Sequence, residues 1–241
     1  MTQQIFETEI QAAEYTAAVI EEIIRQKPDA VLCLAAGHTS LPVFARLIQA
    51  AEEKRIDFGR VRFIGLDEWL GLGVTADGSC ASFLYKNCCD PLKIKPEQIC
   101  LFDGETSDPS AECTRMEACI NAWGDIDYML LGMGMNGHLA LNEPGDLFSN
   151  GAHVTDLDSV TKSVAAKYFS EGMPPLEHGI TLGIRNIMDA GLIHLTVFGA
   201  HKKDAVARLL SAEIHHDFPA SSLKSCGHAV LIFDRAAYGR S

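Results

Sequence analysis

The chain lacks the segments that would direct it to a membrane or out of the cell. Its N-terminus, MTQQIFETEIQAAEYTAA, has no basic stretch followed by an apolar core, and nowhere do eighteen apolar residues run together. A signal peptide requires the first pattern and a membrane-spanning helix requires the second. We therefore expect a cytoplasmic protein with no membrane partner.

Positive charge is scarce. The chain has 20 Lys and Arg against 32 Asp and Glu, which gives a formal net charge of -12. Nonspecific nucleic-acid binding depends on many Lys and Arg that neutralise phosphates, so the composition predicts no nucleic-acid partner. If such a chain binds a phosphate, it must gather its few positive groups locally.

Paired cysteine motifs are also absent. There are eight cysteines, but no CxxC and no Cys/His zinc spacing occurs among them. Eight cysteines might suggest a disulfide framework, but they are spread along the chain without these spacings. The sequence predicts reduced, mostly structural thiols and no metal site. Repeats, low-complexity tracts and long linkers are missing too, so we expect residues 1–241 to form a single domain.

Apolar, β-branched runs alternate with helical patterns along the chain. The runs are DAVLCLAA (29–36), RVRFIGL (60–66), DYMLLGMG (127–134), LIHLTVFG (192–199) and HAVLIFD (228–234), and the helical patterns cover 7–25, 41–54, 109–122 and 201–212. Near-continuous apolar strands alternating with helices are typical of a parallel sheet covered on both faces. The sequence predicts an α/β fold with a mostly parallel, twisted, Rossmann-like sheet. The irregular stretch 145–178, rich in Gly, Ser, Asp and Pro, is a candidate lid.

Ligands in open α/β sheets gather at the carboxyl ends of the strands, so the residues after each run are candidates for function. Gly37, His38, Thr39 and Ser40 follow the first run and precede a helix that begins near Leu41. Free backbone N–H groups and the helix dipole favour a phosphate there, and a hydroxyl could add a donor. The alternative is an ordinary glycine turn with Thr/Ser capping.

Two adjacent acids, Asp67 and Glu68, follow RVRFIGL. A carboxylate enclosed at this edge would have a raised pKa and could act as a general base. Adjacent side chains point in different directions, so we expect one acid to be catalytic and the other structural. The alternative assigns Asp67 to capping and Glu68 to solvent.

The segment DYMLLGMGMNGHLALNEPG opens a buried strand into a glycine-rich loop with Asn136, His138, Asn142 and Glu143. A histidine in such a loop suits proton transfer near neutral pH, and Glu143 is close enough in sequence to orient it. The alternative is a structural histidine within a turn.

Lys202 and Lys203 lie in the first turn of the helix that follows LIHLTVFG. Lysines are disfavoured at a helix N-terminus, so a nearby anion would explain them. The alternative is a solvated pair of charges. The last strand ends in Asp234-Arg235, which we expect at the surface.

Four motifs in order, AGHTSLPVF, FIGLDEW, LLGMGMNGHLALNEPG and GITLGIRNIMDA, resemble the glucosamine-6-phosphate deaminase and 6-phosphogluconolactonase superfamily from end to end. The lactonase branch has a DER-like segment and an SLFPG-like loop ending where this chain has LDEW and LNEPG, which favours the deaminase branch. NGHLALNEPG, KPDAVLCLAAG, HGITLGI and PASSL look closest to the galactosamine-6-phosphate isomerase type.

The resemblance implies conversion of galactosamine 6-phosphate to tagatose 6-phosphate, or of glucosamine 6-phosphate to fructose 6-phosphate, with release of ammonia. It implies a small sugar phosphate as partner and no cofactor, and it leaves a homo-oligomer open. By this resemblance Asp67 is the base between C2 and C1, His138 the ring-opening acid/base and Glu143 its partner. The phosphate would lie on Gly37, His38 and Thr39, with Lys202 closing over it.

The chain departs from the family pattern at three places. Asn136 replaces the Asp of a DGH motif, and an amide cannot stabilise an imidazolium by charge, so ring opening is expected to depend more on Glu143. His38 and Ser40 replace a usual Ser and Pro, and His178 is the nearest basic residue before GITLG. The remaining alternatives are a lactonase in which His138 activates water, and a noncatalytic sugar-phosphate sensor.

Overall fold

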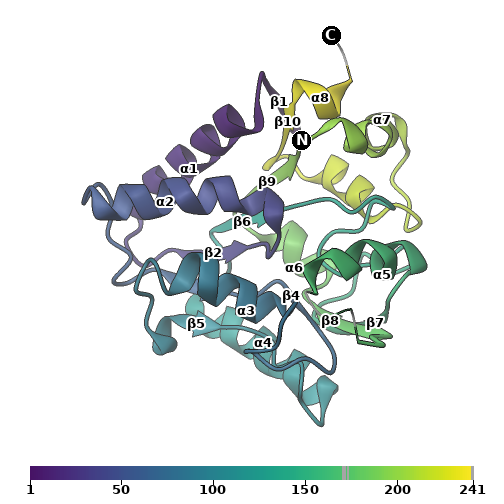
Figure 1. The fold of residues 1–241 in the computed structure, drawn as a ribbon, viewed down its shortest axis with the longest axis horizontal. Coiled ribbons are helices and arrows are strands. Elements are labelled where there is room, and N and C mark those ends of the chain that lie inside the picture. Colours follow the sequence, from purple (N-terminus) through teal and green to yellow (C-terminus); the bar gives the residue numbers. More distant parts are fainter. Residues whose placement is uncertain (170–171, 173, 240–241) are drawn as a thin grey trace.

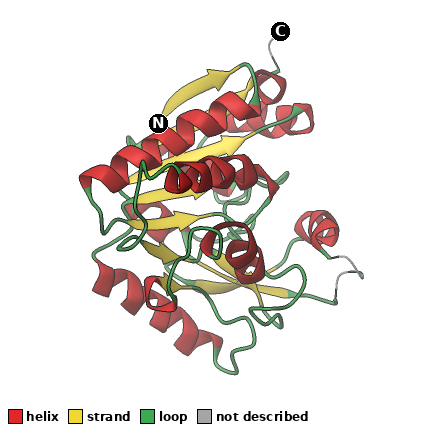
Figure 2. Cartoon of the chain, turned by 60° about the vertical axis from the view of Figure 1, so that its left-hand side comes forward, coloured by secondary structure: helices red, strands yellow, loops and turns green. Residues whose placement is uncertain are grey.

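A seven-stranded parallel sheet forms the centre of the chain (Figures 1 and 2). The computed structural model describes residues 1–169, 172 and 174–239. The strand order is β1-β10-β9-β6-β2-β3-β5, and every neighbouring pair is parallel. The strands are β1 (Thr2–Phe6), β2 (Val31–Leu34), β3 (Arg62–Ile64), β5 (Ile99–Cys100), β6 (Tyr128–Leu131), β9 (Leu192–Val197) and β10 (Ala229–Asp234). The five strands expected from the sequence are confirmed, and β1 and β5 are additional.

Helices cover both faces of this sheet, as Figure 2 shows. Leu32 and Leu34 of β2 pack into one apolar core with α1 and α2, whereas Val31 and Cys33 pack into the opposite core with α4, α6 and α7. This alternation explains why β2 reads as a continuous apolar run, since both faces are buried. The helices are α1 (Glu9–Gln26), α2 (Leu41–Glu52), α3 (Cys80–Leu84), α4 (Pro109–Trp123), α5 (Ser159–Ala165), α6 (Ile184–Asp189), α7 (Lys203–Ser211) and α8 (Arg235–Tyr238).

A small antiparallel sheet, absent from the expectations, lies beside the carboxyl end of β3. Its order is β4 (Asp67–Trp69), β8 (His178–Thr181) and β7 (His153–Asp156). The stretch 145–178, expected to be the least regular, contains β7, α5 and a 3₁₀ turn at Ala166–Tyr168, joined by loops. Residues 170, 171 and 173 of the candidate lid, and 240–241 of the expected domain, lie outside the described residues.

The eight cysteines are all free thiols, and six of them are buried. Asp234 corrects one expectation: it is buried rather than at the surface, whereas Arg235 is exposed. The Asp234 carboxylate accepts hydrogen bonds from the backbone N–H of Gly199 and, at 2.8 Å, from that of Ala237, so it caps α8. No helix within the described ranges is both long and apolar enough to cross a membrane.

His194 of β9 is a buried histidine between two tyrosine rings. It is 1% exposed, and its ring centroid lies 5.8 Å from that of Tyr15 and 5.2 Å from that of Tyr128. Within the described part of the chain its Nδ1 atom has no hydrogen-bond partner. Burial lowers the pKa of His194 to about 4. The folded state therefore holds this imidazole neutral at a pH where the unfolded chain already binds a proton.

We expect this histidine to destabilise the protein in acid. As the pH falls from 6.5 towards 4, the unfolded state binds a proton at His194 that the folded state does not bind. This difference lowers the free energy of unfolding by about 3 kcal/mol. Urea unfolding of wild type and His194→Leu at pH 7.5 and pH 4.5 measures this loss of stability in acid. The variant should lose less stability between the two pH values, and equal losses would show that His194 does not contribute.

Candidate active site

A pocket of about 560 Å³ opens at the carboxyl ends of β2, β3, β6 and β9. These four strands are neighbours in the sheet, and the chain order reverses between β2 and β6. Such a switch point is where open α/β sheets bind ligands, and the volume suits a small molecule. The pocket is lined by six of the residues expected from the sequence: Gly37, His38, Thr39, Asp67, His138 and Lys202. Asn136 and Glu143 do not line it and lie behind His138.

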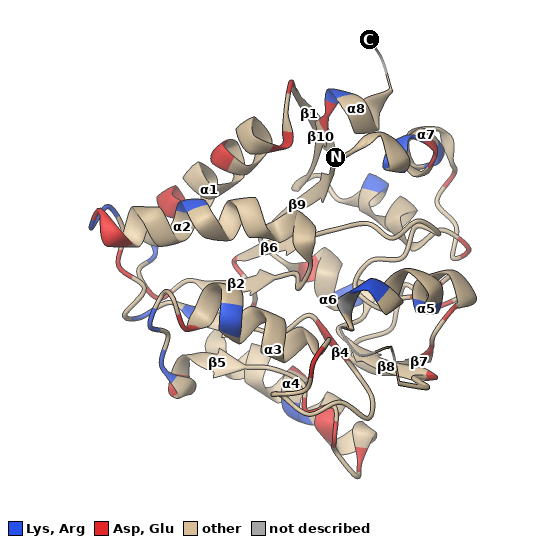
Figure 3. Ribbon diagram, in the orientation of Figure 1, with Lys and Arg blue, Asp and Glu red and all other residues tan. Residues whose placement is uncertain are grey.

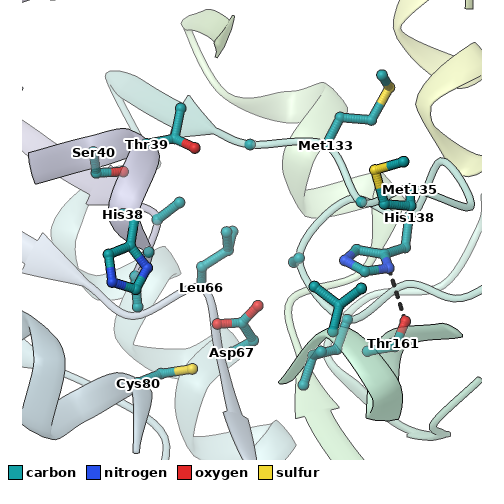
Figure 4. Close-up of a pocket in the computed structure, with 18 of the residues that line it drawn as sticks. His38, Thr39, Ser40, Leu66, Asp67, Cys80, Met133, Met135, His138 and Thr161 are labelled. Atoms are coloured by element: carbon teal, nitrogen blue, oxygen red, sulfur yellow. Dashed lines mark hydrogen bonds between the residues drawn. The ribbon is translucent and has the colours of Figure 1, made fainter. Parts of the chain in front are cut away.

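Asp67 stands where the chain leaves the parallel sheet and enters the small one. It begins β4, pairs with Thr181 of β8, and its carboxylate points into the pocket (Figure 4). Burial raises the pKa of Asp67 to about 7; a hydrogen bond with Cys80 and the charge of His138 lower it, and the charge of Glu68 raises it further. A carboxylate with this pKa can both take up and release a proton near neutral pH.

Glu68, its neighbour, has a structural role. It is 1% exposed and its carboxylate accepts four hydrogen bonds, from the N–H groups of Trp69, Cys80 and Ala81 and from the hydroxyl of Ser79. These bonds fix the start of α3, which holds Cys80 beside Asp67. The two acids thus divide into one in the pocket and one in the framework, and the alternative that left Glu68 in solvent is wrong.

His138 reaches the opposite wall of the pocket from the loop after β6 (Figure 4). The loop turns tightly, because the Gly137 N–H donates to the Gly134 carbonyl at 3.1 Å and the Gly134 N–H donates to the His138 carbonyl at 3.0 Å. A Cβ on Gly134 would lie 2.3 Å from Cε1 of His138, so the ring rests against this backbone. Gly137 has a φ of 90°, a conformation that favours glycine.

Glu143 and Asn136 form a buried network behind His138. Glu143 is 4% exposed, and its Oε2 atom lies 3.6 Å from His138 Nδ1. The Asn136 amide donates to Glu143 Oε2 at 2.9 Å, and its carbonyl oxygen accepts from the His138 N–H at 3.2 Å. Burial raises the pKa of Glu143, but the nearby imidazole of His138, the Thr161 hydroxyl and a hydrogen bond from Asn136 outweigh it and hold the pKa below its ordinary value. Glu143 is thus an anion beside the imidazole.

The loop after β2 forms another wall of the pocket. A 3₁₀ turn at His38–Ser40 continues directly into α2, so the N–H groups of the first turn meet the pocket at the positive end of a long helix. Thr39 and Ser40 both line the pocket, and Ser40 is almost fully buried. Neither residue caps the helix with its side chain.

Lysines add positive charge to this otherwise acidic molecule. Figure 3 shows Lys and Arg on α5 and α7 and acidic residues spread over many elements. Lys202 lines the pocket and its Nζ donates to the Met133 carbonyl at 2.7 Å, whereas Lys203 is exposed outside it. Burial, and then the charge of Lys167, lower the pKa of Lys202 to about 8. An anion bound between these two ammonium groups would favour the charged form of Lys202 and raise its pKa again.

The pocket also contains polar residues that were not predicted from the sequence, among them Cys80, Thr161 and Lys167. Thr161 and Lys167 come from the stretch that looked irregular, where no periodic pattern pointed to a helix facing the sheet. His178, the nearest basic residue before GITLG, instead pairs with Asp156 at 2.8 Å on the small sheet. Across the described ranges, no group of three or more His, Cys, Asp or Glu is placed to hold a metal ion.

The family model for glucosamine-6-phosphate isomerases/6-phosphogluconolactonase matches residues 6–232. The chain belongs to this family. A curated relative, glucosamine-6-phosphate deaminase of Bacillus pumilus (strain SAFR-032), is 36% identical over 232 residues, which is 96% of each chain. This match and the fold confirm the family resemblance that the sequence motifs indicated.

Solved structures in the glucosamine-6-phosphate isomerase/6-phosphogluconolactonase family share the architecture. A structure described as a monomeric glucosamine-6-phosphate deaminase superposes with a TM-score of 0.95 at 32% identity, covering 99% of both chains. A 6-phosphogluconolactonase from Thermotoga maritima has a TM-score of 0.76 at 20% identity, covering 97% of this chain and 98% of its own. The second likeness shows the fold alone, so it does not decide the chemistry.

Proposed function

We propose that the chain is an amino-sugar-6-phosphate isomerase/deaminase that converts galactosamine 6-phosphate or glucosamine 6-phosphate into tagatose 6-phosphate or fructose 6-phosphate and ammonia. The observation that carries the proposal is a carboxylate of raised pKa, Asp67, facing His138 across one pocket. The names of the relatives that are 36% and 32% identical support it.

Ring opening is the first step. His138 takes the proton from the C1 hydroxyl of the closed sugar and delivers it to the ring oxygen, which breaks the C1–O5 bond and yields the open aldehyde. Glu143, which lies behind the ring, stabilises the imidazolium that exists between the two transfers. The amide of Asn136 orients Glu143 without adding charge.

Isomerisation follows at C2 and C1. The Asp67 carboxylate removes the C2 proton to give an enolamine and then returns the proton to C1, so that C1 is reduced and C2 is oxidised to an imine. Water adds to the imine carbon and ammonia leaves, giving the ketose. The near-neutral pKa of Asp67 suits a group that must both accept and donate one proton.

The phosphate is held between the β2 loop and two lysines. The start of the helix at His38–Ser40 supplies N–H groups, and Lys202 and Lys167 supply charge from β9's loop and from the turn after α5. Fixing this end of the sugar makes the proton transfers at the other end effectively intramolecular. Lys167 thereby supplies the positive charge for which the segment before GITLG offers only His178.

Loss of either lysine is expected to weaken substrate binding. Lys202→Met and Lys167→Met should each raise KM by about tenfold or more, because a charge-assisted hydrogen bond contributes about 1.5–3 kcal/mol. Lys203→Met is the matched control, since Lys203 is adjacent but exposed outside the pocket. Steady-state kinetics, with inorganic phosphate as competitor, measure the effect. Unchanged KM in both pocket variants would remove the lysines from the phosphate site.

Ammonia release from galactosamine 6-phosphate and from glucosamine 6-phosphate tests the function, with hydrolysis of 6-phosphogluconolactone in parallel. The epimers differ only at C4, and the motifs NGHLALNEPG and HGITLGI make galactosamine 6-phosphate the first substrate to try. Ammonia from either sugar supports the proposal. Lactone hydrolysis without ammonia would replace it with the lactonase, and binding without turnover would replace it with a sensor.

A further inference from the structure

Thr161 connects α5 to the histidine at the centre of the site. Its Oγ1 atom lies 3.0 Å from His138 Nδ1, the contact dashed in Figure 4, and the residue is 4% exposed. The same hydroxyl also interacts with the Glu143 carboxylate and helps to lower its pKa. Glu143 Oε2 itself stands 3.6 Å from His138 Nδ1, which is too far for a direct hydrogen bond. The hydroxyl therefore bridges the gap between the imidazole and its carboxylate.

The donor and acceptor roles in this bridge follow from the chemistry of the three groups. The Glu143 carboxylate can only accept, and it lies 3.6 Å from His138 Nδ1, so this anion favours a proton on Nδ1 and draws the Thr161 hydroxyl proton towards itself. The hydroxyl oxygen is then left to accept, and the donor is the N–H at His138 Nδ1. This arrangement places the proton of the neutral imidazole on Nδ1. The lone pair of Nε2 is thereby kept free to act as a base.

A second contact attaches α5 to the same network. Asp158 caps α5 by accepting from the Val160 N–H at 2.8 Å, and its Oδ1 atom also lies 3.4 Å from Nδ2 of Asn136. Asn136 Nδ2 in turn donates to Glu143. Positions 158 and 161 are three apart, so the first turn of α5 contacts the network on one face.

We propose that Thr161 is a positioning residue, whose hydroxyl relays between Glu143 and His138 Nδ1 and so fixes the imidazole tautomer that opens the sugar ring. The proposal rests on the proposed function for the role of His138. During ring opening the proton from the C1 hydroxyl enters at Nε2 and leaves again to the ring oxygen. The Nδ1 proton stays in place throughout, so the relay moves no net proton.

The matched variants are Thr161→Val, which keeps the shape and removes the hydroxyl, and Thr161→Ser, which keeps the hydroxyl. We expect Thr161→Val to lower kcat at least tenfold with KM changed less than twofold, and Thr161→Ser to keep most of kcat. Thr196→Val controls for loss of a buried threonine hydroxyl, because Thr196 Oγ1 donates to Leu131 O at 3.0 Å in the sheet, away from the pocket.

Imidazole ¹⁵N chemical shifts provide a readout that needs no substrate. The His138 signal, assigned with His138→Gln, should show the Nδ1–H tautomer in wild type and Thr161→Ser, and a mixture or the Nε2–H tautomer in Thr161→Val. An unchanged tautomer in folded Thr161→Val, or a Thr161→Ser variant as slow as Thr161→Val, would overturn the relay. If no variant and no wild type released ammonia, the proposed function would fail while the ¹⁵N shifts still decided the relay.

Discussion

Replacing Asp67 with Asn is expected to lower kcat about a thousandfold while leaving the protein folded. The amide keeps the size of the side chain but cannot take the C2 proton, and general base catalysis typically contributes about 10²–10⁴-fold. KM should change little, because the phosphate contacts lie on other elements of the pocket. Ammonia release under saturating substrate measures the effect, with Lys203→Met as a variant outside the pocket.

The stability of this variant separates catalysis from folding. Burial raises the pKa of Asp67 to about 7, from 3.8 in the unfolded chain, so the ionised carboxylate destabilises the folded state above pH 7. Asp67→Asn should consequently be at least as stable as wild type in urea at pH 8. A variant that is inactive because it unfolds would contradict the assignment, and so would full turnover by a folded one.

The pH profile of wild type follows from the same raised pKa. Below about pH 7 Asp67 is protonated in the free enzyme and cannot remove a proton, so kcat/KM should fall about tenfold per pH unit on the acid side. An acid limb near pH 4, where an ordinary aspartate titrates, would exclude Asp67 as the group that controls it.

Much of the main sheet could be predicted because its strands are short, buried on both faces and therefore continuous in apolar residues. Residues Val31–Leu34 and Tyr128–Leu131 are fully buried, which is the pattern that predicts a central parallel strand. The edge strand Thr2–Phe6 has four exposed residues, so its sequence carries no such signal. The same holds for His153–Asp156, where two of four residues are exposed.

The site could be predicted in the parts that follow a strand directly. Asp67 and His138 lie within a few residues of β3 and β6, so the rule that ligands gather at strand ends was enough to select them. Thr161 and Lys167 reach the pocket only because the small antiparallel sheet carries α5 back over it. That return depends on the pairing of β8 with β4 and with β7. Asp67 pairs with Thr181, which is 114 positions away in the sequence, and no local pattern predicts such a register.

Gly134→Ala is expected to lower activity strongly in a protein that still folds. A Cβ at this position would lie 2.3 Å from Cε1 and 2.5 Å from Nε2 of His138, so the imidazole must swing away from its place in the pocket. Gly134 does not have a positive φ, and the clashing atoms are the tip of one side chain, so the backbone can accept alanine. With His138 displaced from Thr161, kcat should fall on the order of a hundredfold.

Substitutions at two other glycines test whether displacement of the His138 imidazole causes the loss of activity in Gly134→Ala. Gly227→Ala meets no atom within 4 Å and should behave as wild type. Gly137→Ala combines a φ of 90° with a Cβ only 2.2 Å from the Phe218 ring, so it should lower the urea midpoint as well as activity. If Gly134→Ala were as unstable as Gly137→Ala, its loss of activity would reflect unfolding. If it kept the wild-type kcat, the position of His138 against Gly134 would have no part in the reaction.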